Sequence, residues 1–303
     1  MPMSPVLWSK GVSRSFYLSL RLLPAPMRDA AALGYLLART SDTVADSPTG
    51  DLPGQVAALD DFSSAVAGTR LLPAWPAALI AAVADPRERL LLGRTAELIT
   101  MLQALPAAQT VLVREVVATI TSGQTLDLTR FASGTAGHPV SLPDDAALED
   151  YAWRVAGCVG EFWTRLGLLT MGDGFSTRSE AVLLPLARRY GMGLQLVNIL
   201  RDLPADLAAG RCYLPVADPL DRPILLACHA RWLERARQWV AGSLPYSASL
   251  PLRRLRAASR LPGLLAEETL DLLAHATWES LQARVKVPRR RVYQLLLRAW
   301  LGG

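Results

Sequence analysis

A helical pattern is clearest in residues 195–206, which read QLVNILRDLPAD. The polar side chains of this stretch lie three, four and four residues apart and so share one helix face: Gln195, Asn198, Asp202 and Asp206. The remaining positions are largely apolar, as in a helix that packs against a protein interior. Pro204 cannot donate a hydrogen bond to the carbonyl of Leu200, so we expect the last turn to be loosened or kinked.

The same arrangement occurs much earlier, in residues 35–46, which read YLLARTSDTVAD. Its polar side chains are spaced four, three and four residues apart: Tyr35, Arg39, Asp42 and Asp46. Two carboxylates one turn apart repel each other in water, and a divalent cation turns that repulsion into attraction. Mg²⁺ binds one or two carboxylates together with waters and substrate phosphates. A single pair is usually a solvated helix face, but two pairs on otherwise apolar helices predict Mg²⁺ binding.

Apolar residues recur at helical spacing along nearly the whole chain, and the period-two alternation of strands is hard to find. Helices this apolar must bury their faces against each other. Because no repeat and no change of composition marks a linker, the sequence predicts one all-α domain over residues 1–303. The expected helices span residues 26–46, 55–67, 75–83, 87–104, 107–130, 144–171, 178–203, 222–242, 250–276 and 288–300.

The composition favours a protein with a large apolar interior that does not cross a membrane. Of its 303 residues, 51% are hydrophobic, yet no stretch approaches the roughly 18–20 uncharged apolar residues that span a bilayer. The N-terminus lacks the pattern of a secretory signal. We therefore expect a cytoplasmic protein, with peripheral contact at the inner membrane face left open as a route for product release. Structural thiols and no zinc site are expected, because these residues lack metal-ligand spacing: Cys158, Cys212, Cys228, His138, His229 and His275.

The net charge of +5 comes almost entirely from arginine, because only Lys10 and Lys286 are lysines among the 32 basic residues. Arginine binds phosphate oxygens through a bidentate fork and stays charged in apolar surroundings. The chain has no basic tail and no repeated basic-aromatic pattern, so discrete phosphate sites fit it better than a nucleic-acid track. A non-catalytic helical protein that binds anionic membranes or nucleic acid would explain the charge, but it would not explain the paired aspartates.

Five blocks of sequence resemble the squalene/phytoene synthase family, and the resemblance covers about residues 8–300. The blocks follow in the family's order: SRSF (13–16), YLLARTSDTVAD (35–46), YAWRVAGCVG (151–160), QLVNILRDLPADLAAGRCYLP (195–215) and ARVKVPRRRVY (283–293). The fourth block is highly specific, whereas SRSF is not. The resemblance implies an α-helical isoprenoid synthase fold with a central cavity. It also implies that the two aspartate motifs face each other across the cavity mouth and hold Mg²⁺ on two prenyl diphosphates.

The resemblance also implies a role for individual residues. The metal site would comprise Asp42, Asp46, Asn198, Asp202 and Asp206. Diphosphate oxygens would be bound by Ser13, Arg14, Ser15, Arg39, Arg201, Arg211 and Tyr213. The reacting carbons would be surrounded by Phe16, Tyr35, Tyr151 and Gln195, and the prenyl tunnel would be lined by Val155, Gly157, Val159, Gly160 and Leu194. For the proton that is lost when the cyclopropane closes, the released diphosphate and Tyr151 both remain candidate bases.

The reaction expected from the resemblance is head-to-head coupling of two farnesyl diphosphates through presqualene diphosphate, followed by reduction with NADPH to squalene. SRSF, YLLAR and VKVPR are more similar to the squalene-forming branch than to the phytoene-forming one, and Lys286 and Arg289 become candidate NADPH contacts. Trp163 lies beyond the tunnel residues as a bulky stop, which favours a C15 donor over a C20 donor. Phytoene, dehydrosqualene and presqualene diphosphate synthases, which perform no reduction, remain alternatives. A Rossmann site is not expected, because no GxGxxG opens a βαβ unit.

Overall fold

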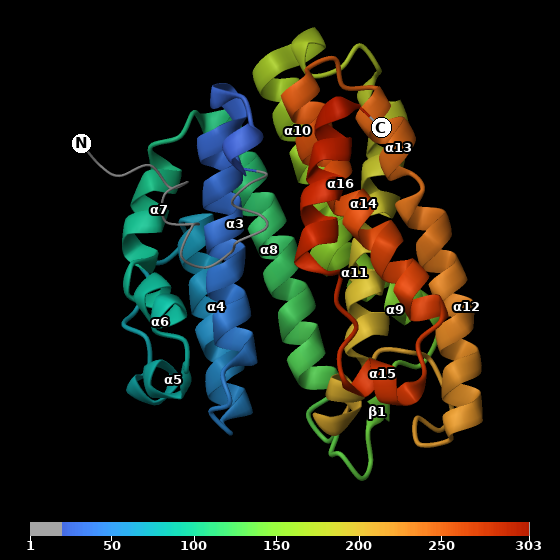
Figure 1. Cartoon of the computed structure of the whole chain (residues 1–303). Coiled ribbons are helices and arrows are strands. Elements are labelled where there is room, and N and C mark those ends of the chain that lie inside the picture. Colours follow the sequence, from blue (N-terminus) through green and yellow to red (C-terminus); the bar gives the residue numbers. More distant parts are fainter. Residues whose placement is uncertain (1–19, 303) are drawn as a thin grey trace. The chain divides into compact units, whose positions relative to one another are not determined.

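The computed structural model describes residues 20–302 (Figure 1). These residues form two compact units that are not contiguous in sequence. The first unit comprises residues 20–129 with 165–172, and the second comprises residues 130–164 with 173–302. The expectation of a single domain stays a prediction.

The first unit is entirely helical in its described part. Its helices are α3 (Ala25–Asp46), α4 (Leu52–Ala67), α5 (Ala77–Ala82), α6 (Pro86–Gly93), α7 (Thr95–Gln103) and α8 (Ala107–Arg130), whose last residue belongs to the second unit. Helix α3 packs against α4, α6 and α7. Val44, Leu59 and Leu92 lie in the small apolar core that these helices share.

The end of α3 is held by a buried glutamine from α4. The amide of Gln55 donates hydrogen bonds to the carbonyl of Ser47 at 2.6 Å and to that of Val44 at 3.2 Å. Carbonyls in the last turn of a helix have no partner within the helix, and a buried one is costly unless another group donates to it. Gln55 therefore stabilises the turn that carries Asp46, the last residue of α3.

The second unit is built around one long helix, α11 (Glu180–Ala208). Its other elements, in chain order, are β1 (Val140–Ser141), α9 (Asp145–Ala152), the π-helical turn η1 (Trp153–Gly157), α10 (Cys158–Met171, which enters the first unit at Arg165), the 3₁₀ turn η2 (Gly172–Gly174), β2 (Arg211–Cys212), α12 (Arg222–Val240), α13 (Ser243–Ala248), α14 (Arg253–Ala274), α15 (Trp278–Gln282) and α16 (Arg289–Leu301). Helix α11 packs against α12, η1, α13 and α14, and its apolar face enters the core beside Trp232. The two short strands pair in parallel, with Val140 opposite Arg211.

The all-α fold class expected from the sequence is confirmed, while several boundaries differ. The expected helix 87–104 is two helices that meet at Arg94, and the expected helix 144–171 contains the π-helical turn η1. The start predicted near residue 144 is confirmed, because the Asp144 carboxylate accepts a hydrogen bond from the amide of Ala147 at 2.8 Å. Helix α11 continues through Pro204 to Ala208, beyond its predicted end. The short helices α13 and α15 were not predicted.

Two expectations about composition can also be compared with the described residues. Cys158, Cys212 and Cys228 are buried and form no disulfide. Across residues 20–302, the helices are either too short or too polar to cross a bilayer.

Candidate active site

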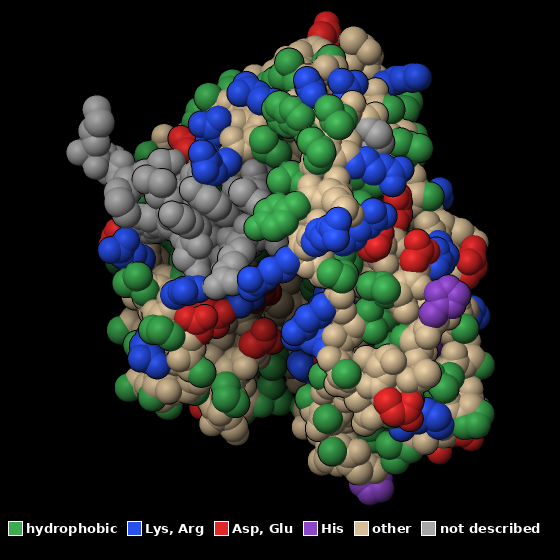
Figure 2. Space-filling view, viewed as in Figure 1, with side chains coloured by type: hydrophobic (Ala, Val, Ile, Leu, Met, Phe, Trp, Pro, Cys, Tyr) green, Lys and Arg blue, Asp and Glu red, His purple; other side chains and the backbone are tan. Residues whose placement is uncertain are grey.

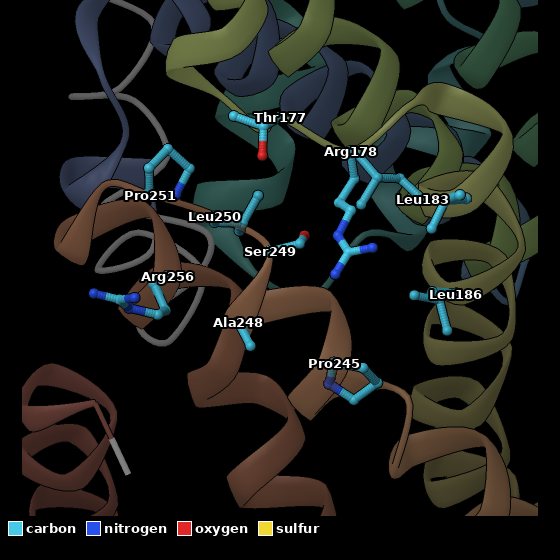
Figure 3. Close-up of a pocket in the computed structure, with 11 residues that line it drawn as sticks. Thr177, Arg178, Leu183, Leu186, Pro245, Ala248, Ser249, Leu250, Pro251 and Arg256 are labelled. Carbon is cyan, nitrogen blue, oxygen red and sulfur yellow. The ribbon is translucent and has the colours of Figure 1, made fainter.

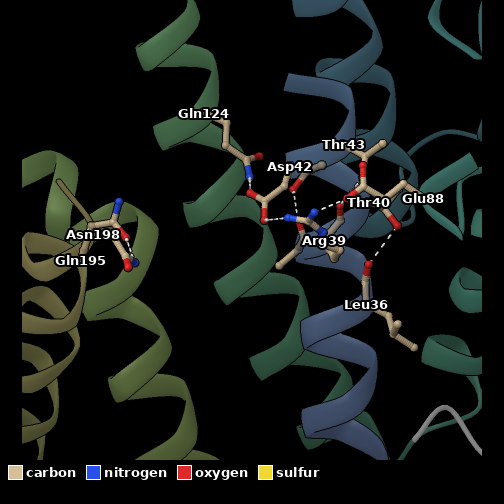
Figure 4. Close-up of polar contacts among 11 residues, drawn as sticks. Leu36, Arg39, Thr40, Asp42, Thr43, Glu88, Gln124, Gln195 and Asn198 are labelled. Carbon is tan, nitrogen blue, oxygen red and sulfur yellow. Dashed lines mark hydrogen bonds and ion pairs between the residues drawn. The ribbon is translucent and has the colours of Figure 1, made fainter. Parts of the chain in front are cut away.

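The first aspartate pair lies on α3, and neighbouring helices of the same unit complete its polar contacts. Asp42 accepts a hydrogen bond from the side-chain amide of Gln124 on α8, and Arg39 lies 3.8 Å from the same carboxylate (Figure 4). Arg39 also donates to the Glu88 carboxylate on α6. Tyr35 is half-buried on the same helix, and Asp46 is exposed at its end. The predicted face of α3 is therefore a connected polar network.

The electrostatics of this network are set by two carboxylates on one helix face. Partial burial and the neighbouring Asp46 raise the pKa of Asp42 to about 6, although Arg39 and the hydrogen bond from Gln124 oppose that rise. Partial burial lowers the pKa of Arg39, but Glu88 and Asp42 outweigh it and raise the pKa overall. A positive charge bound between Asp42 and Asp46 would remove the repulsion that raises the pKa of Asp42.

The second aspartate pair lies on α11, where arginines bind both carboxylates. Asp202 accepts two hydrogen bonds from Arg201, at 2.9 and 2.5 Å, and two from Arg284, at 3.1 and 3.4 Å. Asp206 lies 3.7 Å from Arg211. Partial burial raises the pKa of Asp202, but the hydrogen bonds and charges of the two arginines outweigh it and lower the pKa overall. One turn earlier on α11, Asn198 donates to Gln195 at 3.4 Å.

Three residues in these networks were not predicted from the sequence. Gln124 binds Asp42 from 82 residues away, and Arg284 binds Asp202 across the same separation. Glu88 is the third, as the partner of Arg39. Arg284 is in the late basic block that the sequence analysis singled out, and it has a positive φ of 62°, which is uncommon for a residue with a side chain. No periodic pattern pointed to Gln124 or Glu88.

Three aromatic rings come together in the second unit. The rings of Tyr151 and Tyr213 stack with their centroids 4.8 Å apart. The ring of Phe131 contacts Tyr213 edge-on, with a centroid distance of 5.1 Å. All three side chains are buried. The structure therefore joins Tyr151 and Tyr213, which the sequence analysis had placed at the reacting carbons and at the diphosphate.

The two glycines assigned to the prenyl tunnel, Gly157 and Gly160, lie where helices approach each other closely. A Cβ atom on Gly160 would lie 2.2 Å from the carbonyl oxygen of Ala187 on α11, and one on Gly157 would lie 2.9 Å from the Met192 side chain. The space beside these two glycines is thus filled by α11 on that side, and their small size allows the helices to approach. Their assignment to the tunnel stays a prediction.

The other tunnel residues lie in or beside the same helices. Val155 and Leu194 pack against the core of the second unit, and Val159 is half-buried. Trp163 is half-buried on α10, and its indole nitrogen is buried without a hydrogen-bond partner. The assignment of Trp163 as a chain-length stop stays a prediction.

Four predicted site residues near the N-terminus lie outside the described residues: Ser13, Arg14, Ser15 and Phe16. Lys286 and Arg289 are exposed near the start of α16.

A buried histidine explains how α11 continues past Pro204. Because proline has no N–H, the carbonyl of Leu200 loses its donor four residues later. The ring nitrogen Nε2 of His229 on α12 lies 3.1 Å from this carbonyl and is placed to donate to it. Both Leu200 and His229 are buried, so water does not take this role. His229 therefore supports the turn between Asp202 and Asp206.

We expect the variant His229→Leu to lower the free energy of unfolding by about 2 kcal/mol, since it leaves a buried carbonyl unsatisfied. Adding Pro204→Ala supplies an N–H to the carbonyl of Leu200. That second change should stabilise the His229→Leu variant more than it stabilises the unmodified chain. Chemical denaturation of the four proteins measures this coupling, and equal effects in both backgrounds would contradict it.

The pH dependence of stability gives a second readout for His229. Burial lowers the pKa of His229 below its usual 6.5. The unfolded chain then binds the proton more readily than the folded one, so stability is full above about pH 6.5 and falls as the pH drops below it. This loss should be smaller in the His229→Leu variant.

The oxygen donors present suit Mg²⁺, although they do not form a complete protein cage. Within residues 20–302, no three His, Cys, Asp or Glu side chains converge as a metal site would require. Mg²⁺ commonly takes only one or two carboxylates, and waters and substrate phosphates supply the rest. Asp42 and Asp46 repel each other on one helix face, and a bound cation would relieve that repulsion.

The described residues have the all-α terpenoid synthase fold. The chain belongs to the squalene/phytoene synthase family, whose model matches residues 9–291. Members of this family are head-to-head prenyltransferases that bind isoprenyl diphosphates.

Named relatives in this family differ in the product that they form. The chain is 29% identical over 299 residues to the presqualene diphosphate synthase of Rhodopseudomonas palustris. That alignment covers 93% of this chain and 91% of the relative. It is 27% identical over 311 residues to the squalene synthase of Yarrowia lipolytica, in an alignment that covers 95% of this chain and 64% of the relative. It is also 31% identical over 214 residues to the presqualene diphosphate synthase of Zymomonas mobilis. That alignment covers 69% of this chain and 58% of the relative. The chain thus spans less than two thirds of the length of the last two relatives.

Solved structures with the same fold include two squalene synthases. One is TcSQS in complex with the ligand BPH1237, with a TM-score of 0.80 and 24% identity, covering 97% of this chain and 85% of that one. The other is the squalene synthase HpnC from Alicyclobacillus acidocaldarius, with a TM-score of 0.60 and 20% identity. The match covers 95% of this chain and 92% of that one. At these identities the likeness shows the fold.

Proposed function

We propose that this chain is a Mg²⁺-dependent enzyme that couples two farnesyl diphosphates head to head through presqualene diphosphate and reduces the product to squalene with NADPH. The observation that carries the proposal is the pair of acidic helix faces on α3 and α11, each combined with arginine and amide side chains. Family membership supports the substrate class. The C15 length and the reductive step rest on the sequence blocks.

In this proposal the arginines and carboxylates exchange partners when substrate binds. Without metal, Arg201 and Arg284 neutralise Asp202, and Arg211 neutralises Asp206. Mg²⁺ bound by Asp42 and Asp46, and Mg²⁺ bound by Asn198, Asp202 and Asp206, would each stabilise the negative charge that develops on a leaving diphosphate. Arginines released from the carboxylates would then bind diphosphate oxygens, for which the guanidinium fork is well suited.

The aromatic cluster fits the carbocation chemistry of this reaction. An allylic cation must be kept from water, and the faces of aromatic rings stabilise it electrostatically. Tyr151, Tyr213 and Phe131 form a buried aromatic group in the second unit. We place the hydrocarbon part of the substrate beside this group, with Trp163 limiting its length. The base that takes the proton is either the released diphosphate or Tyr151.

A second candidate function is presqualene diphosphate synthesis without reduction. It is favoured by the relative from Rhodopseudomonas palustris, which carries that name and matches this chain along most of both lengths. The candidate NADPH contacts, Lys286 and Arg289, are exposed side chains. Their role is the part of the proposal that most needs a direct test.

A binding protein without catalytic activity fits the surface less well. On the part of the second unit visible in Figure 2, the described Lys and Arg side chains lie among acidic and hydrophobic ones. A nucleic-acid track would instead present a continuous basic stripe.

Incubation of the protein with farnesyl diphosphate and Mg²⁺, with and without NADPH, tests the proposal. We expect diphosphate release in both reactions and squalene only with NADPH, as measured by lipid extraction and mass spectrometry. Presqualene diphosphate as the end product in both reactions would replace the proposal with the second candidate. If geranylgeranyl diphosphate is the better donor, the phytoene-forming alternative holds instead.

The variant Lys286→Ala separates the reductive step from the first ionisation. If Lys286 binds the nucleotide, this variant forms squalene more slowly while releasing diphosphate at a near-normal rate, and non-reduced C30 products accumulate. Arg290→Ala is the matched control, since Arg290 is another exposed cation four residues away. Equal loss of both activities in Lys286→Ala would place Lys286 at the diphosphate site or in the fold.

A further inference from the structure

The second unit contains a cavity of about 650 Å³ that the proposed reaction does not use. Its walls come from the start of α11, the end of α13 and the start of α14, together with the segments that precede α11 and α14 (Figure 3). The volume lies in the usual range for small-molecule sites. Its lining residues are Thr177, Arg178, Val182, Leu183, Leu186, Pro245, Ala248, Ser249, Leu250, Pro251 and Arg256.

The polar part of this cavity is suited to an anion. Arg178 is exposed, and Figure 3 shows its guanidinium directed toward Ser249; within residues 20–302 this guanidinium forms no ion pair. The Ser249 hydroxyl donates to the carbonyl of Tyr246 at 2.6 Å, so Arg178 is the group that would bind an anion here. The Nε atom of Arg256, which lines the cavity from α14, is buried and has no hydrogen-bond partner. None of the described lining residues is acidic. An exposed guanidinium beside an apolar cavity can bind a phosphate group through its fork of N–H donors.

The rest of the lining is apolar apart from Thr177. Leu183 and Leu250 are fully buried, and Leu186 is half-buried. Val182 is 48% exposed and continues the apolar wall to the protein surface. An inorganic anion would leave this wall in contact with water, whereas a molecule with an anionic head and an apolar chain would cover both parts of the cavity.

The cavity is separate from the aspartates of α11. Leu186 and Asp202 are sixteen residues apart on this helix, which corresponds to about 24 Å along its axis. A ligand of small-molecule size in the cavity therefore does not reach Asp202.

We propose that this cavity binds a phosphate-bearing amphiphile, with its phosphate or diphosphate group at Arg178 and its apolar chain along Val182, Leu183 and Leu186. Arg256 lines the opposite side of the cavity, with its guanidinium directed away from Arg178 (Figure 3). Two kinds of molecule carry this chemistry, namely prenyl diphosphates and anionic phospholipids. The proposal does not depend on the proposed function, and its test is done without metal.

Calorimetric titration of the full chain with decyl phosphate, in EDTA and below the micelle concentration, tests the site. We expect saturable binding that Arg178→Ala weakens about tenfold and that Arg178→Lys largely retains. Ala248→Trp, which fills the cavity from α13, should also weaken binding. Arg189→Ala is the matched control, because Arg189 is an exposed arginine of α11 outside the cavity, and its affinity should be unchanged. Circular dichroism confirms that each variant is folded.

Three results with these single-chain probes would overturn the proposal: no binding of decyl phosphate, equal affinity in Arg178→Ala and Arg189→Ala, or binding of decyltrimethylammonium as tight as that of decyl phosphate. Two further probes then identify the source of the ligand. Farnesyl diphosphate and dihexanoyl phosphatidic acid are titrated under the same conditions, and the one whose binding depends on Arg178 is the class of natural ligand. If neither depends on Arg178, the site does not serve an amphiphile of either source and the proposal is wrong.

Discussion

Replacing Asp42 by Asn will slow Mg²⁺-dependent diphosphate release from farnesyl diphosphate about a thousandfold, which corresponds to about 4 kcal/mol of barrier. The substitution keeps the side-chain shape and an oxygen that can accept the hydrogen bond from Gln124. What it removes is the negative charge that, with Asp46, would hold the cation. We expect a similar loss for Asp202→Asn on α11.

Steady-state kinetics with a Mg²⁺ titration distinguish loss of metal binding from loss of structure. Asp173→Asn is the control, because Asp173 is exposed in the 3₁₀ turn η2 and lies outside the proposed site. Asp42→Asn gives the cleaner result of the two, since Asp202→Asn also leaves Arg201 and Arg284 without their charged partner. Near-normal turnover in both folded variants would show that these aspartates do not act through Mg²⁺.

Replacing Gly160 by Ala will destabilise the second unit by about 3 kcal/mol, at the upper end of what overpacking usually costs. The added Cβ would lie 2.2 Å from the carbonyl oxygen of Ala187 and 2.7 Å from its carbonyl carbon. Both atoms belong to the backbone of α11, so they cannot move aside as the end of a flexible side chain would. Relief of the clash requires α10 and α11 to separate, which disturbs the core around Leu196.

Chemical denaturation of Gly160→Ala and of Gly93→Ala measures this effect. Gly93 is also helical, but a Cβ atom there would meet nothing within 4 Å. Alanine is intrinsically favoured over glycine in a helix by about 1 kcal/mol. Gly93→Ala should therefore be neutral or slightly stabilising, whereas Gly160→Ala should be clearly destabilising. Equal stability of the two variants would mean that α10 and α11 are not packed this closely.

A helix boundary can be predicted from the sequence where a capping side chain marks it. It cannot be predicted where the packing of other helices determines it. Asp144 begins α9 with its own side chain, and the sequence alone indicated that start. The π-helical turn η1 has no such signal, and it lies where Gly157 and the neighbouring Ala156 meet α11. Pro204 indicated a loosened turn, but a donor from another helix lets α11 continue through it.

The acidic faces of α3 and α11 follow from residue spacing, because the 3.6-residue period of a helix places side chains three and four apart on one side whatever the rest of the chain does. The residues that bind these aspartates do not follow from the helical period. Gln124 and Arg284 each reach their aspartate from 82 residues away, and His229 reaches Leu200 from 29 residues away. Such contacts depend on how separate helices pack, and packing reflects the shapes of many side chains at once. The tertiary structure alone therefore decides which charge neutralises Asp202 and which donor replaces the missing N–H of Pro204.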